Sequence, residues 1–304
     1  MILGVVFAVL AAASNALGTV LQRRAVVHVP DSRGRGLALI GDLLHNPAWF
    51  VGILGTVLAA LFQALSLLTG SLATVQPIFI LELPLALVFG SVVFRVGVSA
   101  KAWACVICIF VGLAVALFSA APSGGRPQVP GMAWVPTLLV LGGGGAAFAV
   151  AGLRRPQGLA RAAHLALAAA IGNALTAALV KSSMYVLSQE GAAGFFLAWQ
   201  TYAFAVTGSA SVLLLGYAMQ GGPLIGSQPA LTLGDASVSF LLGVTLYAES
   251  PRGGWWLLPA LAGTALVVYG VFALSRTRCL TKCVNPAEEN RDESRHGRPA
   301  AEAM

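Results

Sequence analysis

Long apolar segments separated by short polar ones run through most of the chain. Each segment is close to the roughly 20 residues that an α-helix needs to cross the hydrocarbon core of a bilayer. Nine segments can be drawn: 2–21, 48–69, 71–94, 102–121, 132–152, 165–187, 194–218, 224–247 and 255–275. The joins at Gly70 and at 219–223 are so short that each predicts a hairpin of adjacent helices. The pattern predicts an all-α, polytopic membrane protein with about nine transmembrane helices.

Composition and the placement of charge agree with this class. Only 10% of the residues are charged, whereas soluble domains carry about 25%. Of the 18 Lys and Arg residues, all but Arg126, Lys181 and Arg252 fall in alternate loops counted from residue 22 or in the tail. Basic residues collect on the cytoplasmic side, which predicts an outside amino terminus and a cytoplasmic carboxyl terminus in a bacterial plasma membrane. The net charge of +7 then reflects topology and attraction to anionic lipid, and no nucleic-acid partner is expected.

The sequence also contains an internal repeat. Residues 70–103 and 222–255 match at an offset of 152, and a segment around Asn15 matches one around Asn173 at an offset of 158. The first match rests on these pairs: Gly70 with Gly222, Leu72 with Leu224, Gln76 with Gln228, Pro77 with Pro229, and Trp103 with Trp255. The matched spans are five apart, an odd number, so each copy crosses the bilayer in the opposite direction to its partner.

This inverted repeat predicts a division of the chain into two membrane halves. The first half, 1–121, holds four helices and the second, 122–275, holds five, because the span rich in glycine at 142–145 has no counterpart. Residues 276–304 have almost no large apolar side chains and predict a disordered cytoplasmic tail. Inverted halves around a polar midplane are a common design of secondary transporters.

The repeated order of motifs resembles the drug/metabolite transporter (EamA-like) superfamily. That order is a tight hairpin, a Gln-Pro helix, an acidic midpoint, a short charged loop and a Gly-rich final helix. The division into four and five helices, the basic end of span 1 (Gln22-Arg23-Arg24) and the segment 172–181 are most similar to its NIPA-type magnesium transporter branch. Gln228-Pro229 and much of span 7 differ from typical NIPA-like sequences. The resemblance implies a membrane transporter and leaves its substrate open.

Two carboxylates, Glu82 and Asp235, lie near the middle of spans 3 and 8. A carboxylate at that depth is costly unless it faces a cavity, a partner or a proton. Facing one cavity, the two acids would bind a divalent metal ion through oxygen ligands or share a coupling proton. The alternative is that each is protonated and hydrogen-bonded to a neighbouring helix as a packing element. In the repeat Glu82 aligns with Gly234, one position from Asp235, so the alignment leaves open whether the acids face each other.

Prolines accompany both acids. Pro77 and Pro229 lie a turn or two inside their predicted helices, and Pro84 follows Glu82 by two residues. Because proline lacks a backbone donor, a broken helix at these positions would free carbonyl oxygens for a cation. The alternative for Pro77 and Pro229 is a place in a first helical turn, which frees no carbonyl.

Further polar residues recur at matched positions within the spans. Gln76 and Gln228 are candidates to bind substrate or to cap their hairpins. Asn15 and Asn173 are expected to face the bundle, because an amide in hydrocarbon needs a partner, and would join helices or contact substrate.

Lys181 and Arg23 occupy equivalent places near the ends of spans 6 and 1. A long cationic side chain at such a place usually extends toward the membrane interface. The sharper alternative for Lys181 is a gate in which it pairs with an acid.

Motifs that carry enzymatic or ATP-driven chemistry are absent from the sequence. It has no phosphate-binding loop with a Walker lysine, no nucleophile elbow and no His/Cys/Asp cluster with metal-ligand spacing. We therefore expect no enzyme and no cofactor, but a secondary transporter that moves a small solute by alternating access. A NIPA-like Mg²⁺ transporter and a non-transporting membrane scaffold are the alternatives. The expected partners are a small-molecule or cation substrate and the lipid bilayer, with a homodimer left open.

Overall fold

The computed structural model describes residues 2–27, 47–95, 97–222 and 224–277. In these ranges the helices are α1 (Ile2–Val27), α3 (Pro47–Thr69), α4 (Leu72–Ile78), α5 (Glu82–Phe94), α6 (Ala100–Ala120), α7 (Gly131–Leu153), α8 (Leu159–Leu197), α9 (Trp199–Gly221), α10 (Leu224–Thr245) and α11 (Leu257–Ser275), with short 3₁₀ turns η2 (Phe79–Leu81) and η3 (Gly254–Trp256). The predicted all-α class is confirmed. The predicted tail, 276–304, lies almost wholly outside the described residues.

Eight segments of the described chain are long and apolar enough to cross a membrane. They include α4 to α5 as one span, but not α10, the helix found where the block 224–247 predicted another span. Helix α10 has the length of a span, but its polar side chains, among them Gln228 and Asp235, lower its apolar character. The count of nine apolar spans is therefore not reproduced, although a helix occupies each predicted block.

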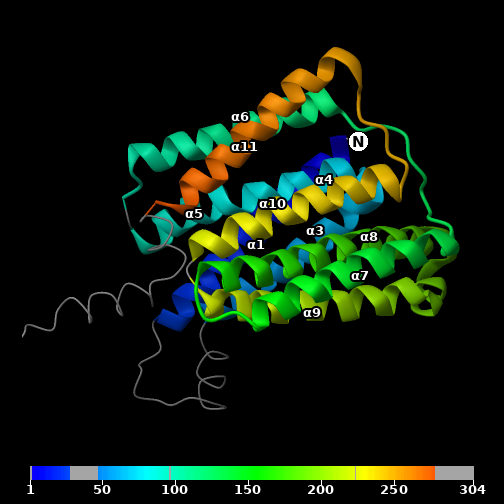
Figure 1. Cartoon of the computed structure of the whole chain (residues 1–304), viewed down its shortest axis with the longest axis horizontal. Coiled ribbons are helices and arrows are strands. Elements are labelled where there is room, and N and C mark those ends of the chain that lie inside the picture. Colours follow the sequence, from blue (N-terminus) through cyan, green and yellow to red (C-terminus); the bar gives the residue numbers. More distant parts are fainter. Residues whose placement is uncertain (1, 28–46, 96, 223, 278–304) are drawn as a thin grey trace, which may run out of the picture.

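The helices lie roughly along one direction, and Figure 1 shows α10 and α4 between α6 with α11 on one edge and α7, α8 and α9 on the other. Helix α1 packs along α3, α8 packs along α9 and α10, and α6 packs against α11. The α6–α11 crossing is close because Gly112 faces Gly263, and a Cβ added at Gly263 would lie 2.6 Å from the Gly112 carbonyl oxygen. Because α10 lies between these two groups of helices, the polar helix is within the bundle.

Several helix boundaries follow the repeat offset of 152. Helix α3 (Pro47–Thr69) and helix α9 (Trp199–Gly221) begin and end 152 residues apart, and so do the starts of α4 at Leu72 and α10 at Leu224. Both predicted hairpins, at Gly70 and at 219–223, connect successive helices as expected.

The third predicted span is interrupted before its acidic residue. Pro77 and Pro84 lack the N–H groups that would bond the carbonyls of Ala73 and Ile80. Between them the chain tightens into the 3₁₀ turn η2, where the Glu82 N–H donates to the Phe79 carbonyl three residues earlier. The chain is therefore tightened but still helical at this segment, and Pro229 stands at the sixth position of the continuous helix α10. The freeing of carbonyl oxygens for a cation at these prolines stays a prediction.

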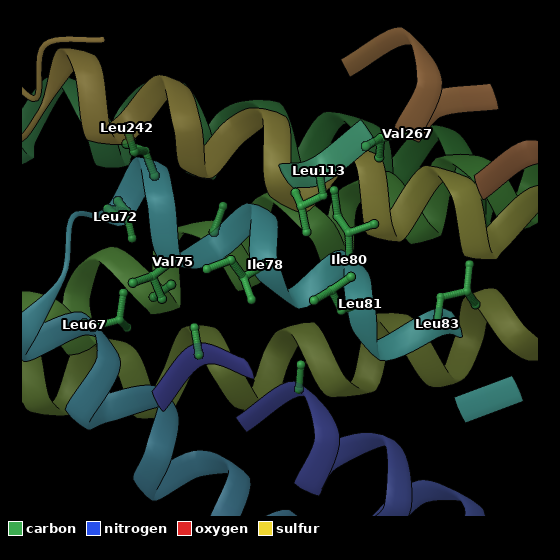
Figure 2. Packing of buried hydrophobic residues seen from close by; sticks show 14 of the residues in the cluster. Leu67, Leu72, Val75, Ile78, Ile80, Leu81, Leu83, Leu113, Leu242 and Val267 are labelled. Atoms are coloured by element: carbon green, nitrogen blue, oxygen red, sulfur yellow. The ribbon is translucent and has the colours of Figure 1, made fainter. Parts of the chain in front are cut away.

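The interrupted segment runs through the largest hydrophobic core cluster. Figure 2 shows buried side chains following one another along it: Leu72, Val75, Ile78, Ile80, Leu81 and Leu83. Leu242 of α10 and Val267 of α11 belong to the same cluster. Apolar side chains pack around this irregular backbone on several sides. Irregular backbone is not tolerated where it faces lipid.

Helix α8 extends further than its predicted span, 165–187. It continues to Leu197, with a break at Gly191 whose φ of 71° lies in the left-handed region that favours glycine. The break at Gly191 falls within the predicted loop 188–193, and a second turn at Ala198 leads into α9.

Candidate functional site

Glu82 lies at the point where the irregular turn η2 becomes α5. As the first residue of α5, its carboxylate is near the positive end of that helix, where a negative charge is favoured. The side-chain amide of Asn15, in α1, lies next to the Glu82 carboxyl. Glu82 and Asn15 are both half-buried. Asn15 therefore gives the candidate acid a polar neighbour from another helix.

Asp235 approaches the same region from α10. The Ser239 hydroxyl, one turn further along α10, donates a hydrogen bond of 3.2 Å to its carboxylate. Asp235 is half-buried and Ser239 is fully buried. Helix α10 packs against α4 and against the turn η2, which directly precedes Glu82. The structure thus places the two acids on neighbouring segments, and a cavity shared by them stays a prediction.

The two repeated glutamines differ in their surroundings. Gln76, in α4, has only 3% of its surface exposed, and its Nε2 has no hydrogen-bond partner among the described residues. Gln228, in α10, is half-buried. The hydroxyl of the preceding residue, Ser227, is buried and also has no hydrogen-bond partner among the described residues. A buried donor left unpaired costs about 1–3 kcal/mol. Each half therefore offers an unpaired donor near the start of an acid-bearing segment.

Among the described residues, no contact of Asn173 with Glu82 or Asp235 is found. It is half-buried in α8, which packs against α10, and no hydrogen bond of its side chain is present among the described residues. The predicted roles of Asn15 and Asn173, in joining helices or contacting substrate, stay predictions.

Lys181 forms a buried ion pair that the sequence analysis did not name. Its Nζ lies 2.7 Å from Oε1 of Glu249, with 11% and 1% of the two side chains exposed. The same ammonium donates to the Gly70 carbonyl oxygen at 3.2 Å and lies 4.7 Å from the centre of the Tyr247 ring. Lys181 therefore pairs with an acid, and its placement relative to the membrane interface stays a prediction. The side chain of Arg23, its predicted equivalent, lies outside the described residues.

The Glu249 carboxylate also accepts two backbone hydrogen bonds. Its two oxygens receive the N–H groups of Leu72 at 2.7 Å and Ala73 at 2.8 Å. These are among the N–H groups at the start of α4 that have no partner within the helix. Glu249 therefore links the start of α4 to Lys181 of α8.

Tyr247 completes this cluster beside the ion pair. Its hydroxyl donates to the Ala178 carbonyl oxygen at 2.6 Å and lies 2.9 Å from the Ser182 hydroxyl, which donates to it. Burial raises the pKa of Tyr247 above its usual value, so the phenol keeps its proton. The sequence signal for this cluster was weak, because Glu249 follows the apolar block and has no acidic counterpart in the other half.

The chemistry available at the two places differs. Glu82 and Asp235 can take up a proton or offer oxygen ligands, and Asn15 adds an amide oxygen. Among the described residues, no three His, Cys, Asp or Glu side chains gather as a metal site would require. The Lys181–Glu249 cluster has its charges and main hydrogen-bonding groups already paired, which suits it to hold structure rather than to bind a solute.

Comparison with known proteins extends over nearly the whole chain. The chain is 29% identical over 284 residues to a protein of Corynebacterium glutamicum that is described only as uncharacterized, covering 91% of this chain and 96% of that protein. No model of a known protein family matches the chain, and no solved structure matches it.

Proposed function

We propose that this membrane protein is a secondary transporter of the drug/metabolite type, which moves a small solute past Glu82 and Asp235 by alternating access. The observation that carries the proposal is the placement of both acids where α10 packs against α4 and against the turn η2 that directly precedes Glu82. Acids placed within membrane-spanning segments are rare and usually serve an ion or substrate path. A discontinuous helix next to such acids is also typical of transporter sites.

The proposed alternating access depends on two halves of similar structure. Helix α1 packs on α3 and α5, as α8 packs on α9 and α10. The bounds of α3 and α9, which are 152 residues apart at both ends, support the same correspondence. An exchange of conformation between such halves would open the acids to one side of the membrane and then to the other.

The unpaired donors indicate which solutes would fit. The Gln76 amide and the Ser227 hydroxyl are both buried without a partner among the described residues. A solute oxygen that accepts these hydrogen bonds would remove the cost of leaving them unpaired. The leading substrate class is therefore a small polar organic solute, with a proton on the acids as the coupling ion.

A Mg²⁺ substrate is the second candidate. Two carboxylates and the Asn15 amide supply oxygen atoms, the ligands that Mg²⁺ takes in proteins. Because no third acid joins Glu82 and Asp235 among the described residues, a bound Mg²⁺ would keep several of its waters.

Uptake by proteoliposomes tests the proposal. One set receives a pH gradient and is read by an internal pH-sensitive dye, and the other receives external Mg²⁺ and is read by a Mg²⁺ dye. The wild type is compared with Glu82→Gln and with Glu190→Gln, a control that removes an exposed acid. We expect proton or Mg²⁺ flux in the wild type and in Glu190→Gln. We expect that flux to be lost in Glu82→Gln.

The outcomes separate the alternatives. Mg²⁺ flux that depends on Glu82 favours the cation, and proton movement without Mg²⁺ flux favours an organic solute. Absence of both fluxes from the wild type would contradict the proposal for these ions and favour the membrane scaffold.

A further inference from the structure

We propose that Lys181 and Glu249 form the lock of a gate that holds one end of the solute path closed. This inference rests on the transport function proposed above and adds to it a device that lies away from the two midplane acids. The end concerned carries the α3–α4 turn at Gly70 and the loop after α10. On the topology predicted from the basic residues, it faces the outside.

The ion pair connects the two predicted halves of the chain. Lys181 and Glu249 both belong to the second half, but their remaining bonds go to the first half. Lys181 donates to the Gly70 carbonyl oxygen, and Glu249 accepts the N–H groups of Leu72 and Ala73. The turn and the start of α4 cannot move away from α8 and α10 without breaking these bonds. Separation of the halves at this end therefore requires the cluster to open.

Two loops pair with each other at the same end. Ser123 and Ser250 exchange backbone hydrogen bonds of 3.1 and 2.9 Å. The Arg126 N–H donates to the Tyr247 carbonyl oxygen at 2.6 Å, and the Arg252 N–H donates to the Ala120 carbonyl oxygen at 2.7 Å. These bonds join the loop after α6 to the loop after α10.

The paired loops lie directly against the acid. A Cβ added at Gly125 would lie 2.9 Å from Cγ of Glu249, so the first loop passes over that side chain with no room to spare. The Gly243 backbone also approaches closely, and its carbonyl accepts the Glu249 N–H at 2.9 Å. This enclosure explains why only 1% of the Glu249 side chain is exposed.

A buried ion pair of this kind suits a two-state gate. In the closed state the charges are shielded from water and satisfied by each other and by the backbone. If the halves separate, water enters and hydrates both charges, and an exposed pair contributes little attraction. The pair therefore stabilises the closed arrangement without preventing the open one.

The repeat does not place the same pair at both ends. At the repeat offsets of 158 and 152, Arg23 corresponds to Lys181, but Gly97 corresponds to Glu249. Within the described residues the ion pair lies at the end that carries Gly70.

A disulfide between the two loops reports the closed state, because Ser123 lies three residues after α6 of the first half and Ser250 directly follows Glu249. Residues that exchange both hydrogen bonds have Cα atoms about 5.5 Å apart, which suits a disulfide. We would make Ser123→Cys with Ser250→Cys in a full-length chain whose four native cysteines are replaced by alanine. The rate of oxidative crosslinking is then compared between this parent and variants carrying Lys181→Gln, Glu249→Gln or the exposed control Glu190→Gln.

We expect rapid crosslinking in the parent and in the control. Crosslinking in Lys181→Gln and Glu249→Gln should slow by roughly threefold or more, because the closed state in which the thiols meet becomes less populated. Glu249→Asp keeps the carboxylate and should remain closer to the parent. Every variant is first required to elute as the parent does in gel filtration, so that a misfolded chain is not taken for an open gate.

Crosslinking needs no substrate and so separates this inference from the transport proposal. Equal rates in Lys181→Gln, Glu249→Gln and the control would overturn the lock, even if proton or Mg²⁺ flux is observed. Slower crosslinking without any flux would support the lock as a structural device and count against transport. In a transporting protein, the disulfide should stop flux and a reductant should restore it, and continued flux through the crosslinked protein would also overturn the gate.

Discussion

The ammonium of Lys181 and the carboxylate of Glu249 are 2.7 Å apart and almost completely buried, although 68 residues separate them in the chain. The carboxylate also accepts two backbone N–H groups at the start of α4. These added bonds make the two partners unequal, because Glu249 satisfies three donors whereas Lys181 satisfies one carboxylate and one carbonyl. This inequality leads to the first two predictions.

Removal of either partner alone should destabilise the fold. Lys181→Met or Glu249→Gln leaves a buried charge without its counterpart, which costs about 3–5 kcal/mol. The double variant Lys181→Met with Glu249→Gln should recover only part of this loss, since the amide that replaces the Glu249 carboxylate would present one acceptor oxygen to two N–H groups. Unfolding in detergent, measured as a double-mutant cycle, checks this. Additive losses would show that the two side chains are not coupled.

Exchange of the two charges should not restore the protein. Lys181→Glu with Glu249→Lys keeps an ion pair, but it places an ammonium against the N–H groups of Leu72 and Ala73, and donors cannot satisfy donors. We expect the exchanged variant to be no more stable than Glu249→Gln when thermal unfolding is measured. Wild-type stability in the exchanged variant would mean that the α4 contacts contribute nothing.

Loss of Asn15 should affect transport more than loss of Asn173. Asn15→Ala removes the amide that lies next to the Glu82 carboxyl, so the acid loses a polar neighbour within the bundle. Asn173→Ala is the matched control, since it alters the corresponding amide of α8 without a recorded contact to either acid. The initial rate of flux in proteoliposomes measures the difference. Equal rates for the two variants would argue that Asn15 serves only to pack α1.

Glycine at the α6–α11 crossing should be intolerant of a side chain. Gly263→Ala would place a Cβ 2.6 Å from both the Ala116 nitrogen and the Gly112 oxygen, forcing the helices apart at a cost of about 1–3 kcal/mol. Gly143→Ala, in α7, meets nothing within 4 Å and should be neutral or stabilising, because alanine favours helix. Thermal unfolding of the two variants compares them, and equal midpoints would contradict the close crossing.

Much of the framework could be predicted from the chain alone. Bilayer thickness sets the length of an apolar helix, so the composition and the spacing of polar residues placed the hairpin at Gly70 and the acids within helices. The repeat offset of 152 reappears in the bounds of α3 and α9 because equal residue patterns favour equal helix ends. The two prolines also predicted a disturbed helix before Glu82, because Pro77 and Pro84 each remove a backbone N–H donor near the same short segment.

Other features could not be read from local patterns. Pro229 has the position of Pro77 in the repeat but causes no 3₁₀ turn, since no second proline follows it within α10 as Pro84 follows Pro77. The block 224–247 was expected to form a span, but the helix found there, α10, is not apolar enough to be counted among the eight.

By itself the sequence determined the class of the protein, the order of its helices and the positions of Glu82 and Asp235 within helical segments, because these depend on residue patterns within single segments. Only the tertiary structure decided that α10 packs against the turn before Glu82, that Asn15 lies next to Glu82 and that Lys181 pairs with Glu249. These contacts depend on how α1, α4, α8 and α10 pack and rotate against one another. A single helix carries no record of its rotation toward a partner many residues away, so the pairing of its polar side chains emerges only when the bundle is assembled.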